Sequence, residues 1–440
     1  MGHTPGDGRE RCIVVHPNVQ GSASSSRSSS SHLEECVGLA VAIDLNVVFS
    51  EVLNVNRPKP ATLLGGGAVE RVGEQAELDE HGIDVIVVDT ALTPIQQRNL
   101  ERAWGRKVID RTGLILEIFG ARARTREGRL QVDLAAQTYQ RSRLVRSWTH
   151  LERQRGGAGF MGGPGETQIE TDRRLIDQRI TRLKRELKDV TRTRNLHRQA
   201  RRKVPYPIVA LVGYTNAGKS TLFNRLTDSD VVARDQLFAT LDPTMRGLDL
   251  PSGRSVILSD TVGFVSDLPH ELVNAFHATL EEVTEADLII HVRDCAHPDT
   301  LAQRNDVLQV LSELGLWQTD DSPLSESADS PMIEALNKAD QLDTDQIAVL
   351  RKQISRSDGQ MHLLSAITGE GCALLLQAID SHITAGYETL QVSLKPEDGA
   401  ALAWLYEHGE VIERKDDDTS IELSVRMDSA NAERFQRKLY

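Results

Sequence analysis

The chain has 440 residues and a formal net charge of −13, and 39% of its residues are hydrophobic. This length exceeds one ordinary domain of about 100–200 residues, so several modules are expected. No run of about 18 apolar residues occurs, and the first residues lack the pattern of a secretory signal, so neither a membrane partner nor secretion is expected. The four cysteines lie far apart without C-x-x-C spacing. This spacing predicts reduced thiols in the cytoplasm and no zinc site.

The first part of the chain predicts a tail followed by a small domain. Residues 1–32 contain SASSSRSSSS and little to bury, which predicts a disordered tail. In residues 33–120, the apolar run Asp84–Asp89 predicts a buried strand, and Thr93-Pro94 predicts the start of a helix. Helices alternating with strands indicate a small α/β domain.

Residues 121–204 are predicted to form an antiparallel helical hairpin. The second helix has apolar residues at heptad spacing, which are Ile169, Ile176, Ile180, Leu183, Leu187 and Val190. The first helix has a shorter repeat of the same kind at Leu144, Trp148 and Leu151. Between them lies RGGAGFMGGPGE, whose glycines and proline cannot continue either helix. The predicted tip is longer than a reversal needs, which favours a functional loop over a plain turn.

Positive charge is concentrated in this hairpin. Residues 121–203 contain 22 lysines and arginines against 9 acidic residues, a net charge of +13, so the rest of the chain carries −26. A basic segment in an acidic chain predicts contact with a polyphosphate such as RNA or DNA. The alternative is a solvated helix face with salt bridges to its own acidic residues. We favour nucleic acid, because like charges repel one another when no partner neutralises them.

Residues 205–385 begin with a phosphate-binding motif. The apolar run Pro207–Val212 predicts a strand that ends at GYTNAGKS, a match to G-x-x-x-x-G-K-[ST] before a helix. In such a loop, backbone N–H groups surround the phosphates, the lysine reaches the β- and γ-phosphates, and the hydroxyl binds Mg²⁺. We therefore predict Ser220 as a Mg²⁺ ligand and nucleotide contacts from Gly213, Tyr214, Thr215, Asn216, Ala217, Gly218, Lys219 and Ser220.

A second apolar run, Ser255–Asp260, opens into the sequence D-T-V-G. The carboxylate can hold Mg²⁺ through water and the glycine N–H can sense the γ-phosphate, so contacts are predicted from Asp260, Thr261, Val262 and Gly263. Ras-like enzymes place a glutamine next to orient the attacking water, but this chain has Phe264. The catalytic residue is therefore unknown. Slow hydrolysis is expected unless another part of the chain, a potassium ion or a large partner supplies the missing group.

The motif N-K-A-D predicts selection of guanine. It follows the apolar run Met332–Leu336, and its carboxylate can accept hydrogen bonds from guanine N1–H and the exocyclic amine, a donor pair that adenine lacks. A later Ser-Ala pair suits a backbone contact to guanine O6. The predicted contacts are Asn337, Lys338, Ala339, Asp340, Ser365 and Ala366. Together these motifs predict an enzyme that hydrolyses GTP with Mg²⁺ as cofactor.

One further Mg²⁺ ligand is expected between the P-loop and the D-T-V-G turn. The segment FATLDPTMR, residues 238–246, contains two threonines. Thr240 is our choice for the Mg²⁺-binding threonine of the first switch, and Thr244 is the second choice. The remaining alternative is that both are ordinary loop hydroxyls.

All of these motifs together resemble the HflX family of translational GTPases. The most specific match is GGPGETQIETDRR, Gly162 to Arg174, at the predicted hairpin tip, and FATLD, DTVGF and NKAD complete it. The match covers about residues 33–385. The resemblance implies further nucleotide contacts from Phe238, Ala239, Thr240, Leu241 and Asp242.

The resemblance also implies a cytoplasmic GTPase that binds the large ribosomal subunit and splits or rescues ribosomes under stress. The hairpin would bring its tip towards the peptidyl transferase centre. Contacts to rRNA are then expected from Gly162, Gly163, Pro164, Gly165, Arg173 and Arg174. We expect a monomer whose docking is gated by GTP and whose hydrolysis is stimulated by ribosomes. Two alternatives remain, a GTPase for RNA remodelling or ribosome assembly and a scaffold with a structural nucleotide.

Two segments depart from the resemblance. Residues 319–331, TDDSPLSESADSP, predict an acidic surface insertion of unknown role. Residues 386–440 predict a small α+β appendage with a helix at Ala400–His408, a hairpin over Glu410–Val425 and a last helix. Its acidic surface either faces ribosomal protein or is a solvated exterior. The predicted fold class is thus α/β, a P-loop G domain preceded by the small α/β domain and the hairpin and followed by this appendage.

Overall fold

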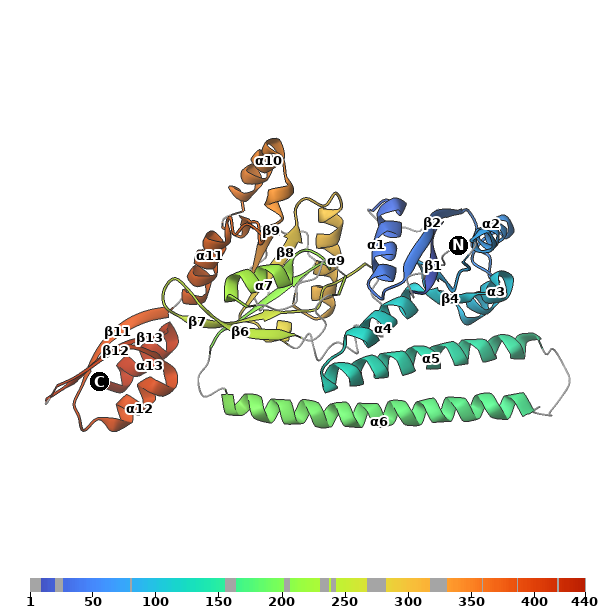
Figure 1. Ribbon diagram of the computed structural model, residues 1–440. Coiled ribbons are helices and arrows are strands. Elements are labelled where there is room, and N and C mark those ends of the chain that lie inside the picture. The colour runs from blue at the N-terminus through green and yellow to red at the C-terminus, as the bar shows by residue number, and fades with distance from the viewer. Residues whose placement is uncertain are drawn as a thin grey trace, which may run out of the picture.

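The computed structural model describes residues 9–19, 27–79, 81–154, 164–201, 206–229, 237–238, 243–266, 282–316, 331–357, 359–385, 387–417 and 419–439. Figure 1 shows an N-terminal α/β body, a central α/β body and a small C-terminal body, with two long helices side by side beneath the first two. The predicted fold class is therefore confirmed. Among the helices in this part of the chain, none has both the length and the apolar character needed to cross a membrane.

The N-terminal body is a parallel four-stranded sheet with helices on both faces. The strand order is β2-β1-β3-β4, and the strands are β1 (Arg11–Val19), β2 (Asn46–Val55), β3 (Val85–Val88) and β4 (Lys107–Asp110). One face packs against α1 (Ser29–Val41) and α4 (Arg111–Arg122). The other face packs against α2 (Gly66–Leu78) and α3 (Pro94–Trp104). Burial on both faces explains why its inner strands are continuous apolar runs.

The prediction of a disordered tail over residues 1–32 is wrong for the residues that form β1 and the start of α1, and residues 1–8 and 20–26 lie outside the described residues. β1 lies between β2 and β3, and the side chains of Cys12–Val15 are fully buried. α1 begins at Ser29, and the Ser28 hydroxyl accepts a hydrogen bond from the Ser31 N–H at 3.2 Å. A serine-rich composition is typical of tails, but serine is also a favoured N-cap residue, and here it begins a helix. The predicted α/β domain therefore begins within the predicted tail.

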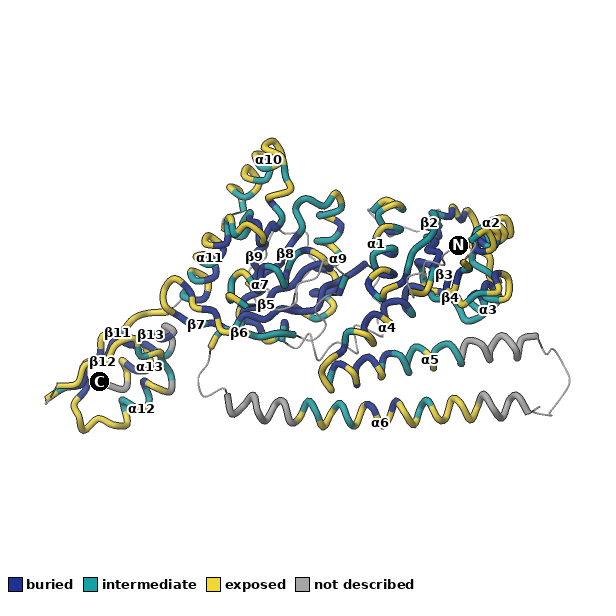
Figure 2. The backbone as a smooth tube through the Cα atoms, viewed as in Figure 1, coloured by how far each residue is buried: buried dark blue, intermediate teal, exposed yellow. Residues whose placement is uncertain are grey.

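The hairpin consists of α5 (Arg126–Gln154) and α6 (Pro164–Arg201), which run antiparallel (Figure 1). In the predicted seam, Ile180 and Leu183 are buried against α5, whereas most neighbouring residues of α6 are exposed (Figure 2). The predicted tip extended too far, because Pro164 and Gly165 form the first turn of α6. Proline is tolerated there, since the first N–H groups of a helix have no intrahelical partner. The rest of the predicted tip lies outside the described residues.

The central body is a six-stranded sheet of order β10-β9-β8-β5-β7-β6, parallel except for the edge strand β6. Its strands are β5 (Ile208–Gly213), β6 (Thr244–Asp249), β7 (Ser255–Asp260), β8 (Leu288–Asp294), β9 (Met332–Asn337) and β10 (Met361–Leu363). α7 (Lys219–Thr227) and α11 (Cys372–Thr384) cover one face, and α9 (Thr300–Glu313) packs on the other. α10 (Thr344–Ile354) lies beside the edge strand β10.

One hydrophobic core continues from the N-terminal body into the central body. It contains residues of α1 and α4 together with Tyr214, Phe238 and Phe264 of the central body. The ring of Phe119 in α4 meets the Phe238 ring edge to face, with centroids 4.7 Å apart. Such aromatic pairs add about 0.5–1.5 kcal/mol beyond their buried area. The two bodies are therefore packed together rather than joined by a free linker.

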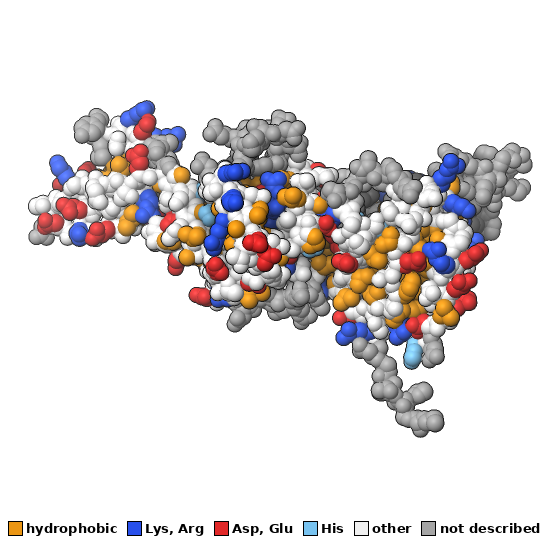
Figure 3. All heavy atoms as spheres, turned by 90° about the horizontal axis from the view of Figure 1, so that it is seen from above, with side chains coloured by type: hydrophobic (Ala, Val, Ile, Leu, Met, Phe, Trp, Pro, Cys, Tyr) orange, Lys and Arg blue, Asp and Glu red, His pale blue; other side chains and the backbone are white. Residues whose placement is uncertain are grey.

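The C-terminal body has a hydrophobic core of its own. Its antiparallel sheet has the order β11-β13-β12, with β11 (Tyr387–Leu394), β12 (Glu410–Asp416), β13 (Ile421–Asp428), α12 (Gly399–His408) and α13 (Ser429–Leu439). The helix, the hairpin and the last helix agree with the sequence, whereas β11 had not been predicted. Acidic side chains gather at the outer end of this body (Figure 3).

Candidate nucleotide-binding site

The P-loop lies between β5 and α7, as its motif predicts. Gly213 has a φ of 152°, and a Cβ atom there would lie 2.2 Å from the backbone oxygen of Val292 in β8. Gly218 has a φ of 90°, and a Cβ atom there would lie 2.2 Å from Nδ2 of Asn337. Both positions combine a left-handed backbone with no room for a side chain. The loop can therefore keep this shape only with glycine at its two ends.

Replacing Gly213 by alanine is expected to lower the free energy of unfolding by about 1–3 kcal/mol, the usual cost of overpacking. The neighbouring atom is a backbone oxygen inside the sheet, so it cannot move away as a flexible side chain would. Urea unfolding should show a lower midpoint for this variant. Gly247 in β6 is the matched control, because a Cβ atom there meets nothing within 4 Å. An unchanged midpoint for Gly213→Ala would contradict the steric argument.

The ammonium group of Lys219 is folded over the P-loop. Its Nζ donates to the backbone oxygens of Gly213 at 3.1 Å and Tyr214 at 2.8 Å, and the side chain is buried. Burial lowers the pKa of Lys219 to about 8, although the nearby Asp260 carboxylate opposes that shift. A buried cation in this position is well suited to a bound anion, because a phosphate would restore the charge compensation that water no longer gives.

A hydroxyl and a carboxylate meet directly beside this lysine. Ser220 Oγ donates to Asp260 Oδ2 at 2.7 Å, and Asp260 is fully buried at the end of β7. Mg²⁺ takes oxygen ligands and usually keeps several waters while binding only one or two protein groups plus phosphates. This donor set therefore fits Mg²⁺. No group of three or more His, Cys, Asp or Glu residues suited to a metal occurs in the described ranges.

The turn after β7 lies on the P-loop. Phe264 N–H donates to the Gly213 oxygen at 3.1 Å, and Thr215 N–H donates to the Phe264 oxygen at 2.7 Å. Gly263 sits so close that a Cβ atom would lie 2.9 Å from Thr215 Cα and 3.0 Å from Lys219 Nζ. Thr261 Oγ1 donates to the Leu211 oxygen at 2.6 Å. A shift of this turn would therefore displace P-loop residues through these contacts.

The Phe264 side chain is buried in the shared core, with 2% of its surface exposed. Its ring has no hydrogen-bonding group and is packed among apolar side chains. The position where a Ras-like enzyme has its glutamine thus holds no group that could orient a water molecule. This agrees with the sequence, and it leaves the catalytic residue unassigned.

The predicted guanine loops are joined to the P-loop by Asn337. Its Nδ2 donates to the Ala217 oxygen at 2.8 Å, and its Oδ1 accepts from the Ala366 N–H at 2.9 Å. Lys338 has a φ of 68° and its Nζ pairs with Asp294 Oδ2 at 2.8 Å. Asp340 lies at the surface in a short 3-10 helix after Ala339, open to a ligand. The amide side chain of Asn337 thus joins its own loop to the P-loop and to the Ser365-Ala366 loop.

The structure does not test every predicted residue. Ala239, Thr240, Leu241 and Asp242 lie outside the described residues, as do Gly162 and Gly163. Phe238 is described and its ring is buried in the shared core. Thr244, our second choice for the switch threonine, begins β6 opposite Asp260. Arg225 was missed by the sequence analysis. It holds the Ser365-Ala366 loop through a hydrogen bond from its Nε to the Ala366 oxygen at 3.1 Å and through another to the Ile367 oxygen.

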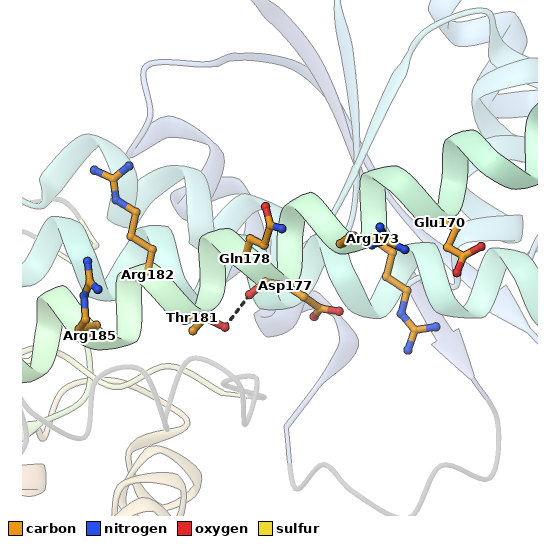
Figure 4. Close-up of a pocket in the computed structure, with 8 residues that line it drawn as sticks. Glu170, Arg173, Asp177, Gln178, Thr181, Arg182 and Arg185 are labelled. Atoms are coloured by element: carbon orange, nitrogen blue, oxygen red, sulfur yellow. Dashed lines mark hydrogen bonds between the residues drawn. The ribbon is translucent and has the colours of Figure 1, made fainter.

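A second candidate surface lies on α6. An open depression of about 690 Å³ is lined by Glu170, Arg173, Arg174, Asp177, Gln178, Thr181, Arg182 and Arg185. Figure 4 shows the labelled arginines projecting from the helix. Within the described part of α6, the side chain of Arg182 donates to Glu186 at 2.7 Å. Arginine side chains on an open helix face suit phosphate groups, because each guanidinium can donate in a fork geometry.

Family comparisons agree with this arrangement along the chain. Residues 30–120 match a family described as GTP-binding GTPase N-terminal, and residues 122–201 match GTP-binding GTPase Middle Region. Residues 208–338 match 50S ribosome-binding GTPase, and residues 349–440 match HflX C-terminal domain.

Similar proteins cover almost the whole chain. The GTPase HflX of Magnetococcus marinus is 49% identical over 404 residues, which are 92% of this chain and 90% of that protein. The GTPase HflX of Escherichia coli K12 is 44% identical over 374 residues, 84% of this chain and 83% of that one. The GTPase HflX of Caldanaerobacter subterraneus is 39% identical over 428 residues, 97% and 93% of the two chains. The chain therefore belongs to the HflX family and is a GTPase.

Proposed function

We propose that the loops at the carboxyl edge of the central sheet hold GTP and Mg²⁺. The P-loop residues Gly213–Ser220 would surround the phosphates, with Lys219 on the β- and γ-phosphates. Mg²⁺ would be bound by Ser220 and Thr240, and it would neutralise charge on the phosphates. The guanine base would lie against Asn337–Asp340 and Ser365-Ala366. The proposal is supported by the Ser220–Asp260 pair and by Asn337, which brings these loops together.

We further propose that the partner is the large ribosomal subunit, contacted through its rRNA. The observation that carries this proposal is the arginine-lined face of α6, in the hairpin where the chain concentrates its positive charge. The family matched by residues 208–338 is named for 50S ribosome binding, which supports the same partner. Arg173 and Arg174 would contact phosphates, together with Pro164 and Gly165 in the first turn of α6 and with Gly162 and Gly163. Such a partner would place the protein in the cytoplasm.

GTP would gate this docking. Ordering of the segment around Thr240 and of the Asp260–Gly263 turn by GTP and Mg²⁺ would fix the hairpin in its binding pose, and hydrolysis would release it. Phe264 cannot orient a water molecule, so we propose that the bound subunit stimulates hydrolysis. We assign the protein to ribosome splitting, rescue or recycling under stress, acting as a monomer.

Salt dependence tests the rRNA contact. Replacing Arg173, Arg182 and Arg185 together by glutamine should weaken GTP-dependent binding to purified large subunits. The slope of log K against log salt is negative, and it should become less negative by roughly one for each phosphate that an arginine no longer neutralises. Sedimentation of the subunits at several salt concentrations measures both quantities.

The matched control for this experiment is Arg437→Gln. Arg437 is an exposed arginine of α13 that pairs with Glu433 four residues earlier, as Arg182 pairs with Glu186 on α6. It should leave the slope unchanged. Binding of the triple variant with the slope of the unmodified protein would show that the α6 face does not contact rRNA.

A further inference from the structure

Two neighbouring residues at the start of α4 attach to different parts of the molecule. Asp110 is the N-cap of α4, and its Oδ1 accepts from the Gly113 N–H at 2.8 Å. Arg111 is the first residue of the helix. Both side chains are buried. In Figure 1, α4 lies where the N-terminal body, the central body and the hairpin come together. Asp110 contacts α5 of the hairpin, and Arg111 contacts Ser266, which follows the D-T-V-G-F turn.

Asp110 holds the first helix of the hairpin. Tyr139 of α5 donates its hydroxyl to Asp110 Oδ1 at 2.6 Å, and Arg143 of α5 donates to Asp110 Oδ2 at 3.1 Å. The Arg143 guanidinium also lies over the Tyr139 ring, 4.7 Å from its centroid, and donates to Gln97 of α3. The hairpin is therefore attached to the N-terminal body by a carboxylate whose two oxygens are both engaged.

Arg111 holds the segment that follows the D-T-V-G-F turn. Its guanidinium donates to both the backbone oxygen and Oγ of Ser266 at 3.0 Å. It also pairs with Asp89 at 2.6 Å and with Glu35 of α1. Burial alone would raise the pKa of Asp89, but Arg111 and His16 outweigh burial and lower it. The pair is thus charged inside the protein, where breaking one partner away is costly.

The same cluster reaches the P-loop through Tyr214. The Ser266 N–H donates to the Tyr214 hydroxyl at 2.7 Å, and that hydroxyl donates to the Glu35 carboxylate. Glu35 also accepts from Ser266 Oγ at 3.0 Å. Arg111, Glu35, Ser266 and Tyr214 therefore form one buried hydrogen-bonded cluster between the two bodies. Because these residues hydrogen-bond to one another, a displacement of Ser266 would disturb its bonds to the other three.

From these contacts we propose that the Asp110-Arg111 step is a relay between the hairpin and the nucleotide site. Force on α5 acts on Asp110 through Tyr139 and Arg143. A displacement of Asp110 also displaces Arg111, the next residue in the chain. Arg111 positions Ser266, and Ser266 follows the D-T-V-G-F turn that lies on the P-loop. Asp110 and Arg111 are positioning residues for GTP hydrolysis. The relay rests on the proposed binding of the large subunit by the hairpin, and it gives a route by which that binding raises hydrolysis at a site without a catalytic glutamine.

The test distinguishes a loss of the relay from a loss of subunit binding and from a loss of basal GTP hydrolysis. A Tyr139→Phe, Arg143→Gln double variant removes the hairpin's two hydrogen bonds to Asp110, together with the bond from Arg143 to Gln97 of α3. Arg141→Gln is the matched control, because Arg141 is an exposed arginine of the same helix that pairs with Asp177 of α6 at 3.2 Å. For each protein, kcat and KM for GTP are measured with and without purified large subunits. Subunit binding is measured separately with a non-hydrolysable GTP analogue.

The relay predicts that the double variant keeps its basal kcat, its KM and its subunit affinity while its stimulated kcat falls by about tenfold, within the usual range of coupling between sites. Arg141→Gln should be stimulated like the unmodified protein, and Tyr139→Phe with Arg143→Lys should recover part of the stimulation. Full stimulation of the double variant would overturn the relay alone. An equal loss of basal and of stimulated hydrolysis would also overturn the relay, because residues that only stabilise the fold would lower both rates alike. An unmodified protein that subunits do not stimulate would overturn the relay and the proposed partner together.

Discussion

Replacing Lys219 by alanine is expected to lower kcat/KM for GTP by at least about a hundredfold, the usual loss when one preorganised donor to a charged transition state is removed. Lys219 is the buried cation of the P-loop, and its ammonium group is held over the loop by the Gly213 and Tyr214 oxygens. Alanine would leave the phosphates without this buried positive charge. Steady-state hydrolysis and the affinity for a fluorescent GTP analogue measure the loss.

The control for this prediction is Lys352→Ala, which removes an exposed lysine from α10. It should hydrolyse GTP like the unmodified protein. Because docking is proposed to require bound GTP, Lys219→Ala should also lose its nucleotide-dependent binding to large subunits. A variant that retains this binding would contradict the assignment of Lys219 and the proposed gating.

The second large effect is expected from Asp340→Asn, which should change the base that the enzyme selects. Hydrogen bonds to a charged group contribute about 1.5–3 kcal/mol each, so losing two of them should weaken GTP binding by about a hundredfold or more. The asparagine amide can instead accept from N1–H of xanthine and donate to its second carbonyl oxygen. Xanthosine triphosphate should therefore become the better substrate.

Competition between the two nucleotides for the purified variant measures this change. Asp345→Asn is the matched control, since Asp345 is an exposed acid only five residues along the chain, in the first turn of α10. It should keep the preference for GTP. Unchanged discrimination by Asp340→Asn would show that another group reads the guanine edge.

The strand, loop and helix of the P-loop follow from the sequence because the motif is local. A P-loop needs one strand, a few glycines and one helix, and all of these stand in a single short segment. The helix after Thr93 was predictable for the same reason. The Thr93 hydroxyl accepts from the Gln96 N–H, and the Gln96 side chain accepts from the Thr93 N–H, which makes a capping box.

The features that the sequence did not predict depend on contacts between distant residues. β1 is a short apolar run next to a serine-rich segment, and its burial depends on pairing with β2 and β3. The buried cluster between the two bodies joins Glu35, Arg111, Tyr214 and Ser266, whose spacing in the chain has no regular pattern. No local rule identifies such partners, because their meeting depends on how two bodies pack. β11 pairs with β13, from Leu394 opposite Ile421 to Tyr387 opposite Asp428, which is also a non-local contact.

For Phe264, the sequence predicts one part of the mechanism and leaves another part open. The sequence indicates that the glutamine is absent, and the structure shows why the ring cannot stand in for it, since it is buried in the core shared with the N-terminal body. The same burial joins the D-T-V-G-F turn to that body. What replaces the glutamine is therefore a question about the partner and about how its binding reaches the turn.

GTP hydrolysis with and without purified large subunits, at several salt concentrations, tests whether the large ribosomal subunit drives this GTPase. We expect slow hydrolysis by the protein alone and strong stimulation by the subunits. The stimulation should fade as salt screens the contact between the basic hairpin and rRNA. Tight GTP binding without any stimulation by subunits, at low salt as well as high, would exclude the ribosome as the partner.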